Sequence, residues 1–175
     1  PATLQLTNWI GGHASGKLLS APYLHYLPLK ETTLAKSLKR AGYKSFHVGK
    51  WHLGDKEYWP KNHGFDANVG GCHHGHPPRG YFSPYGIETL DEGPKGEYLT
   101  DRLTSEAITL VEGAKDNPFF LYMSYYSVHT PIQSPKELVE KYEKKRKDMG
   151  LDKVKELERG EMFPTLLKRP MKVKR

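Results

Sequence analysis

Hydrophobic positions recur at helical spacing in two parts of the chain. After Thr32, the side chains of Leu34 and Leu38 fall on one face, and Gly42 follows as a stop signal, so a short helix is predicted here. Residues 100–112 repeat this spacing and predict a second helix. Each of these segments is followed by a short apolar run, which is typical of alternating helices and strands in a layered sheet.

The two apolar runs predict strands of different character. Residues 43–48 form a short strand with Phe46 and Val48 facing one side. Residues 119–126 are almost continuously apolar and rich in aromatic residues, and Asn117-Pro118 breaks the chain before them. A short apolar run bounded by turn signals indicates a buried central strand.

A third helix is predicted near the end of the chain. Ser134 can cap it, Pro135 suits its first position, and Gly150 ends it. By contrast, residues 54–97 are dominated by Gly, Pro, His and Tyr, and we expect no regular elements there. A long irregular segment inside a compact domain is usually functional or partly disordered.

The net charge of +7 changes this picture little. Residues 136–175 carry 14 Lys and Arg against 8 Asp and Glu, so six of the seven net charges lie there, interleaved with glutamates as on a solvated helix face. A nucleic-acid partner is therefore not expected. No apolar run is long enough to predict a membrane span, and the single cysteine excludes an internal disulfide framework.

The most informative stretch joins the first predicted strand to a lysine and a histidine. The strand ends in Gly49, and Lys50 and His52 follow. Ligands of open α/β sheets bind at the carboxyl ends of strands, and residues two apart in extended backbone point to the same side. A lysine charge beside an imidazole suits a small tetrahedral anion, whereas the alternative is an exposed lysine next to a packed histidine.

This stretch resembles the second signature of the formylglycine-dependent (type I) sulfatases, Gly-Tyr-x-[Ser/Thr]-x-x-x-Gly-Lys-x-His. It matches at six positions, which are Gly42, Tyr43, Ser45, Gly49, Lys50 and His52. Two further stretches are similar to the same family. The apolar run 119–126 is followed by His129-Thr130-Pro131, and His63-Gly64-Phe65-Asp66 resembles a Gly-Phe-Asp turn of the family.

The resemblance implies a fold, an activity and roles for three residues. The fold would be part of an alkaline-phosphatase-like three-layer α/β sandwich with a mostly parallel sheet and a long irregular Gly/His/Pro-rich insert. The activity would be sulfuric ester hydrolysis. Lys50 would neutralise charge on the sulfuryl group, His52 would orient the sulfate or the nucleophile, and His129 would protonate the leaving oxygen. These three side chains should then converge on one cleft.

Other parts of the family's site are missing from the sequence. Its Cys-x-Pro-Ser-Arg motif, whose cysteine becomes formylglycine, is absent, and Cys72 is followed by His73-His74-Gly75. The paired aspartates and the Asp-Asn-Gly that bind metal are absent too, because Asp116-Asn117 is followed by proline. We therefore expect an internal fragment that is inactive alone, with formylglycine and calcium supplied in the full-length protein and no cofactor bound by these residues.

Histidines gather in the irregular insert at His73, His74 and His76. Three histidines in four residues without a helix do not easily face one ion, and with no cysteine or carboxylate expected beside them we predict no metal site. His74 is instead a candidate substrate contact. Arg79 and Tyr81 could bind a sugar or an anion, or belong to a packed loop.

The expected function is a sulfatase fragment acting on a sulfated small molecule or sulfated carbohydrate, in the periplasm or outside the cell as the resemblance implies. Two alternatives stay open: a phosphoester or phosphonate hydrolase of the same superfamily, and a non-catalytic polyanion-binding module. The predicted organisation is an irregular 1–30, a helix and strand with Lys-x-His at 31–54, an insert at 55–98, a helix and strand ending in His129 at 99–131, and a basic helix and tail at 132–175.

Overall fold

The computed structural model describes residues 24–151, which belong to two compact units. The described part of the first unit consists of residues 24–75, 87–91 and 103–125, and that of the second consists of residues 76–86, 92–102 and 126–151. Each unit is described by itself.

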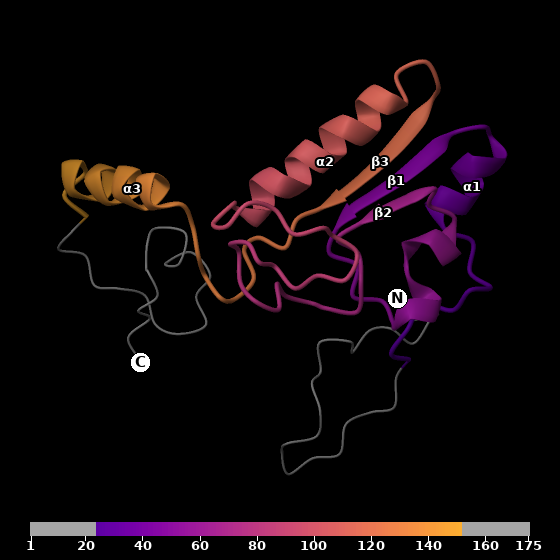
Figure 1. Ribbon diagram of the computed structural model, residues 1–175, viewed down its shortest axis with the longest axis horizontal. Helices are drawn as coiled ribbons and strands as arrows, with labels where there is room; N and C mark the ends of the chain where they lie inside the picture. The colour runs from indigo at the N-terminus through magenta and orange to yellow at the C-terminus, as the bar shows by residue number, and fades with distance from the viewer. Residues whose placement is uncertain (1–23, 152–175) are drawn as a thin grey trace, which may run out of the picture. The chain divides into compact units, whose positions relative to one another are not determined.

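The first unit is built on a parallel sheet of three strands, β1 (Lys44–Gly49), β2 (Ala67–Val69) and β3 (Phe119–Ser124), in the order β2-β1-β3 (Figure 1). Both pairings are parallel, with Val48 opposite Val69 and Gly49 opposite Ser124. The carboxyl ends of the strands therefore share one edge of the sheet, and the predicted α/β class with a parallel sheet is confirmed.

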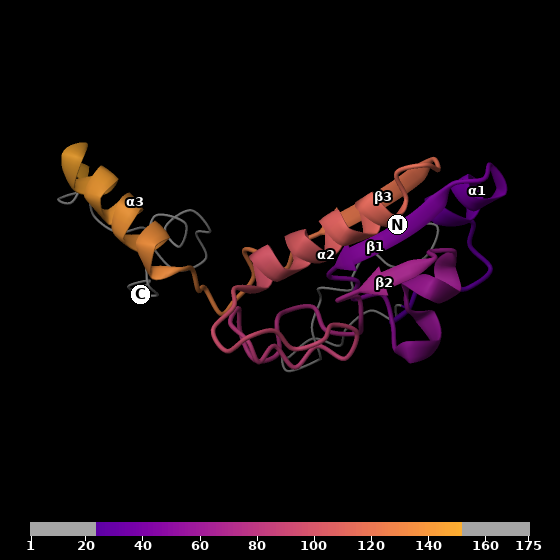
Figure 2. The same cartoon turned by 45° about the horizontal axis from the view of Figure 1, so that its top comes forward.

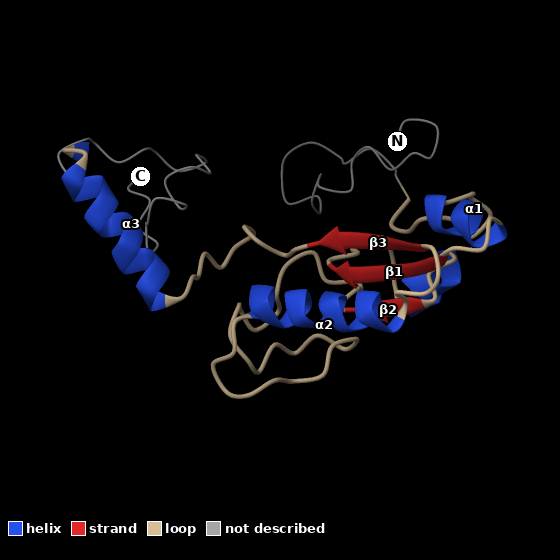
Figure 3. Cartoon of the chain, turned by 90° about the horizontal axis from the view of Figure 1, so that it is seen from above, coloured by secondary structure: helices blue, strands red, loops and turns tan. Residues whose placement is uncertain are grey.

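Helices precede both longer strands, as the spacing of hydrophobic residues predicts. The helix α1 (Leu34–Arg40) leads into β1, and its N-cap Thr33 accepts a hydrogen bond from the backbone N–H of Lys36 at 3.1 Å. The helix α2 (Leu99–Gly113) leads into β3. Figures 2 and 3 show α2 lying along one face of the sheet, where its Leu103 is fully buried.

The burial of the two longer strands differs from the prediction. β1 is the central strand, and all of its residues from Ser45 to Gly49 are buried. The central position expected for β3 stays a prediction, because among residues 24–151 only β1 pairs with it and its further sheet neighbours are expected outside these residues. Its Phe119 and Tyr122 are exposed. A strand is buried when other strands pair with both of its edges and other elements pack on both of its faces. Its apolar composition alone does not show that these neighbours are present.

The insert contains more regular structure than the sequence indicates. Besides β2, it forms two short 3-10 helices, η2 (Lys56–Tyr58) and η3 (Pro60–His63). The expectation of no regular elements was therefore wrong. Elements of three or four residues are too short for an apolar spacing to repeat, so a periodicity argument passes over them.

The second unit contains α3 (Lys136–Asp148) and a set of buried tyrosines. The predicted helix is confirmed, but its N-cap is Pro135 without a side-chain hydrogen bond, so the predicted cap by Ser134 was wrong. Tyr81 and Tyr85 are buried, and their hydroxyls bond within the unit, that of Tyr85 to a carboxylate oxygen of Glu97 at 2.9 Å. These bonds hold together a segment that has few aliphatic residues.

Gly49 lies against the backbone of β3 at the end of β1. Its φ is +106°, in the region that favours glycine, and a Cβ there would lie 1.9 Å from the carbonyl oxygen of Ser124. No side chain fits at that distance. The glycine at the end of β1 is therefore required by the packing of the sheet.

Replacing Gly49 by alanine should lower the free energy of unfolding by about 2–4 kcal/mol, because the new methyl group must push the two strand ends apart. The matched control is Gly42→Ala. Gly42 also has a positive φ, +84°, but no atom lies within 4 Å of the position its Cβ would take. The Gly42→Ala substitution should lower the free energy of unfolding by about 1 kcal/mol, from backbone strain alone. Urea denaturation measures both values, and equal losses would contradict the close approach.

Two buried histidines, His47 and His63, lie in an aromatic cluster of the first unit. The ring of His47 contacts Trp51, Phe65 and Tyr122, with ring centroids 5.2–5.6 Å apart. Burial lowers the pKa of His47 and of His63 to about 4, because an imidazolium loses its hydration there.

Stability should therefore fall as the pH decreases from 7 to 5. The unfolded chain takes up protons near pH 6.5, whereas the folded protein keeps both imidazoles neutral down to about pH 4, so the loss is on the order of 1–2 kcal/mol per buried histidine. Urea midpoints at several pH values measure this loss. His47→Gln should flatten the dependence, because the buried imidazole that stays neutral in the folded protein is removed. An unchanged slope in His47→Gln would contradict the assignment.

Candidate functional site

Lys50 stands directly after the carboxyl end of β1, held there by Ser124 of β3. The backbone N–H of Lys50 donates to the carbonyl oxygen of Ser124 at 2.6 Å, and the Ser124 hydroxyl donates to the carbonyl oxygen of Lys50 at 2.7 Å. Both backbone groups of the lysine are thus fixed by one residue of the neighbouring strand. This fixes the Cα of Lys50 at the sheet edge where ligand sites of α/β proteins form.

The Lys50 side chain is half-buried, and burial lowers the pKa of its ammonium group. Loss of hydration disfavours the charged form. A bound anion would offset this cost, since an opposite charge nearby stabilises the ammonium form. A partly desolvated lysine therefore binds a tetrahedral anion more strongly than a fully solvated lysine does.

His52 has a backbone conformation that the sequence argument did not foresee. Its φ is +60°, so the backbone is left-handed there, and the inference that Lys50 and His52 share a side in extended backbone was wrong. Its N–H donates to the carbonyl oxygen of Cys72 at 3.0 Å. Its ring lies against Gly75, where a Cβ would come within 2.4 Å of the imidazole Cε1 atom.

The loop that supports His52 leaves β2 at the same edge of the sheet. Asn68 bonds to Gly71 through both ends of its side-chain amide, at 2.8 and 3.1 Å. Thr89 holds the loop from another part of the chain, because its carbonyl oxygen accepts from Gly70 and its hydroxyl donates to Gly71. The segment around Cys72 is therefore positioned by side chains as well as by the strand.

His129 belongs to the second unit, where it is exposed. The buried Tyr81 fixes its backbone, since the Tyr81 hydroxyl lies 2.7 Å from the carbonyl oxygen of Tyr126 and 3.0 Å from that of His129. The Nδ1 atom of His129 lies 2.9 Å from the carbonyl oxygen of Thr130. A carbonyl oxygen only accepts, so Nδ1 carries the hydrogen in this bond, and Nε2 is the second ring nitrogen.

The remaining predicted residues lie in both units. His74 is half-buried in the loop of the first unit that also supports His52, whereas Arg79 is exposed in the second unit, its side chain packed over Gly86. Tyr81 is buried and its hydroxyl donates to backbone carbonyls, which agrees with the packed-loop alternative. Burial also raises the pKa of the Tyr81 hydroxyl to about 12.

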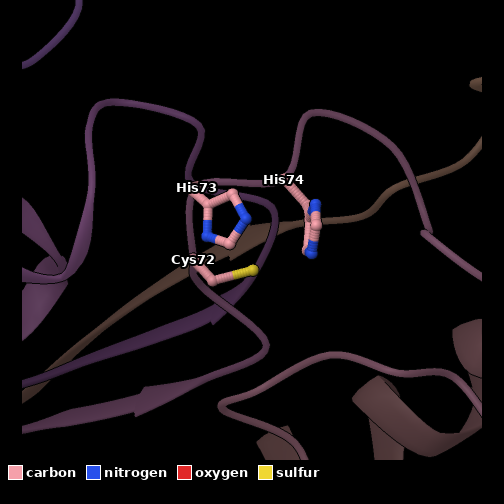
Figure 4. A group of neighbouring side chains, drawn as sticks. All are labelled: Cys72, His73 and His74. Atoms are coloured by element: carbon pink, nitrogen blue, oxygen red, sulfur yellow. The ribbon is translucent and has the colours of Figure 1, made fainter.

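A group of three potential metal ligands lies in the same loop. One ligand atom from each of Cys72, His73 and His74 can be chosen so that all three lie within 4.8 Å of one another (Figure 4). The expectation that no cysteine or carboxylate would lie beside the histidines was wrong. Cys72 is part of the group, and a carboxylate oxygen of Glu88 lies 3.6 Å from His73 Nδ1.

Several residues that position the site were not singled out by the sequence argument. Ser124 fixes Lys50, Gly75 makes room for His52, and Asn68 shapes the loop. The glycine next to a histidine-rich stretch was a usable signal, because glycine often marks a close approach to another group. Ser124 carried no such signal, since its role depends on strand pairing.

Comparison with known proteins places the chain in one family. A model of the family described as Sulfatase matches residues 5–157. The uncharacterized sulfatase YdeN of Escherichia coli K12 is 34% identical over 135 residues, which cover 62% of this chain and 24% of that protein. An arylsulfatase of Hemicentrotus pulcherrimus is 33% identical over 129 residues, covering 62% of this chain and 23% of its own length. A mouse N-acetylgalactosamine-6-sulfatase is 28% identical over 151 residues, which cover 73% of this chain and 28% of that protein.

Solved structures agree with this assignment. The crystal structure of Ps i-CgsB in complex with k-i-k-neocarrahexaose is similar with a TM-score of 0.54 and 27% identity, over 83% of this chain and 34% of that chain. The described residues therefore form part of an alkaline-phosphatase-like α/β fold. Within residues 24–151, no helix has both the length and the hydropathy needed to cross a bilayer.

The chain spans about a quarter of the length of the curated relatives it matches. The family match nevertheless covers most of the chain itself and includes the strand end with Lys50 and His52 as well as the segment around His129. The chain belongs to the sulfatase family.

Proposed function

We propose that the protein carrying this chain is a sulfuric ester hydrolase and that Lys50, His52 and His129 act on the sulfate group. The observation that carries this proposal is the fixed position of Lys50 at the carboxyl end of β1. The lysine is partly desolvated and held by Ser124, with the His52 loop at the same sheet edge. Family membership supports the choice of a sulfate ester among tetrahedral anions.

In the proposed mechanism, each of the three residues has a separate task. The ammonium group of Lys50 neutralises charge on the sulfuryl oxygens, which grows as the bond between sulfur and the ester oxygen breaks. His52 hydrogen-bonds to the sulfate and orients it. His129 acts in its imidazolium form: Nδ1–H stays bonded to the carbonyl oxygen of Thr130, and the proton on Nε2 passes to the leaving ester oxygen, so the alcohol departs neutral and the imidazole is left neutral.

Formylglycine and calcium are proposed as groups of the whole protein, contributed by chain outside these 175 residues. The residues present do not fit either group. The 175 residues contain no Cys-x-Pro-Ser-Arg and no Asp-Asn-Gly, and the sole cysteine, Cys72, is buried and followed by two histidines. The steps above therefore involve only side chains of this chain.

The proposed substrate is a sulfated carbohydrate or another sulfated small molecule. Two similar proteins support the carbohydrate: the name of one is N-acetylgalactosamine-6-sulfatase, and another was crystallised with k-i-k-neocarrahexaose. We propose His74 and Arg79 as contacts to the substrate outside its sulfate group, His74 by donating a hydrogen bond from one ring N–H, a role that its other ring nitrogen does not share. Family resemblance also suggests a periplasmic or extracellular location.

In the full-length protein, Lys50→Ala should lower kcat for 4-nitrophenyl sulfate by about 10²–10³, as the loss of one charge-stabilising group commonly does. His129→Ala should lower kcat by about 10²–10³ for a sulfated sugar, whose alkoxide leaves poorly without a proton, and by much less for 4-nitrophenyl sulfate, whose leaving group departs as the anion. The exposed lysine Lys61 gives the matched control, and Lys61→Ala should retain full activity.

Two outcomes would contradict the proposal. One is a full-length protein that hydrolyses 4-nitrophenyl phosphate faster than the sulfate, which would indicate a phosphoester hydrolase. The other is Lys50→Ala with unchanged kcat and KM. The 175-residue chain alone provides the background rate, and we expect it to be inactive because it lacks the formylglycine motif.

A further inference from the structure

We propose that Cys72, His73 and His74 form a site for one thiophilic metal ion of the zinc class, separate from the calcium expected in the whole protein. Their ligand atoms lie within 4.8 Å of one another in the loop after β2. Figure 4 shows the Cys72 sulfur turned toward the space between the two imidazole rings. One thiolate and two imidazoles are a donor set that zinc favours.

The distances are close to those of a zinc site. With bonds of about 2.3 Å to sulfur and 2.0–2.1 Å to nitrogen, the donors around a tetrahedral ion lie about 3.4–3.6 Å apart. The observed upper limit of 4.8 Å therefore requires a contraction of about 1 Å. His73 and His74 are only half-buried, so small rotations of their side chains can achieve it.

A carboxylate next to the group strengthens the assignment. Glu88 places one carboxylate oxygen 3.6 Å from Nδ1 of His73. Histidines that bind zinc usually donate their other ring N–H to a carboxylate, which fixes the tautomer and raises the basicity of the ligating nitrogen. His73 would then bind the ion through Nε2 while Nδ1 faces Glu88.

The surroundings suggest what an ion would do here. Three protein ligands leave a fourth position for water or another small ligand. The carbonyl oxygen of Cys72 accepts from the N–H of His52, and Gly75 lies against the His52 ring. An ion that joins residues 72–74 would therefore hold in place the loop on which His52 rests.

The test uses the 175-residue chain, freed of metal with a chelator, with Zn²⁺ and Co²⁺ as probes. Calorimetry should give one Zn²⁺ per chain, and Co²⁺ should produce a thiolate charge-transfer absorption. Cys72 is the only cysteine in the 175 residues, so this band has only one source. Cys72→Ser should abolish the band, and His74→Ala should weaken Zn²⁺ binding by about 100-fold or more. His76→Ala is the matched control and should bind as the unchanged chain does.

The Glu88→Gln variant tests whether the folded loop forms the metal site. The alternative is that Cys72, His73 and His74 bind the ion only because they are adjacent in sequence. Glu88→Gln should weaken Zn²⁺ binding by about 10–100-fold, as the loss of a carboxylate behind a ligating histidine does. A synthetic peptide of residues 70–77 should bind more weakly than the chain. Binding without a thiolate band, equal losses in His76→Ala and His74→Ala, or a Glu88→Gln chain that binds normally would each overturn the proposal. These readouts do not depend on sulfatase activity, so they are independent of the proposed function.

Discussion

The parallel pairing of β1 with β3 at Gly49 and Ser124 is the interaction on which the candidate site depends. The strand ends approach so closely that no Cβ fits at Gly49, and this approach lets Ser124 bond to both backbone groups of Lys50. The lysine is fixed by the sheet itself rather than by a flexible loop. A charge that is to stabilise a transition state must be held in position before the reaction, and the two bonds from Ser124 fix the backbone from which the Lys50 side chain extends.

The second element of the site rests on a loop with few apolar residues. Asn68 and Thr89 hold Gly70 and Gly71, and the following residues carry the hydrogen bond and the close packing that fix His52. Polar side chains and glycines thus replace hydrophobic packing at this end of the sheet.

Sequence reasoning succeeded where a pattern extends over many residues or where a motif is specific. The helices α1, α2 and α3, the strands β1 and β3 and the parallel α/β class follow from spacing and punctuation, and the Gly-Lys-x-His motif pointed to the family. It failed where the answer depends on partners distant in sequence. Within residues 24–151, β1 is the central strand because it pairs on both sides, and its composition did not indicate this. The left-handed backbone at His52 and the meeting of Cys72 with two histidines depend equally on how the loop folds.

The central claim is that Lys50, His52 and His129 act on a single sulfate group, and a crystal structure of the full-length protein with bound sulfate or a sulfated sugar tests it most directly. The claim predicts that the Lys50 Nζ atom, a ring nitrogen of His52 and Nε2 of His129 all lie within hydrogen-bond reach, about 3 Å, of oxygens of one sulfate. A structure in which His129 lies at a different edge of the sheet from Lys50, with the sulfate bound by only one of them, would contradict it.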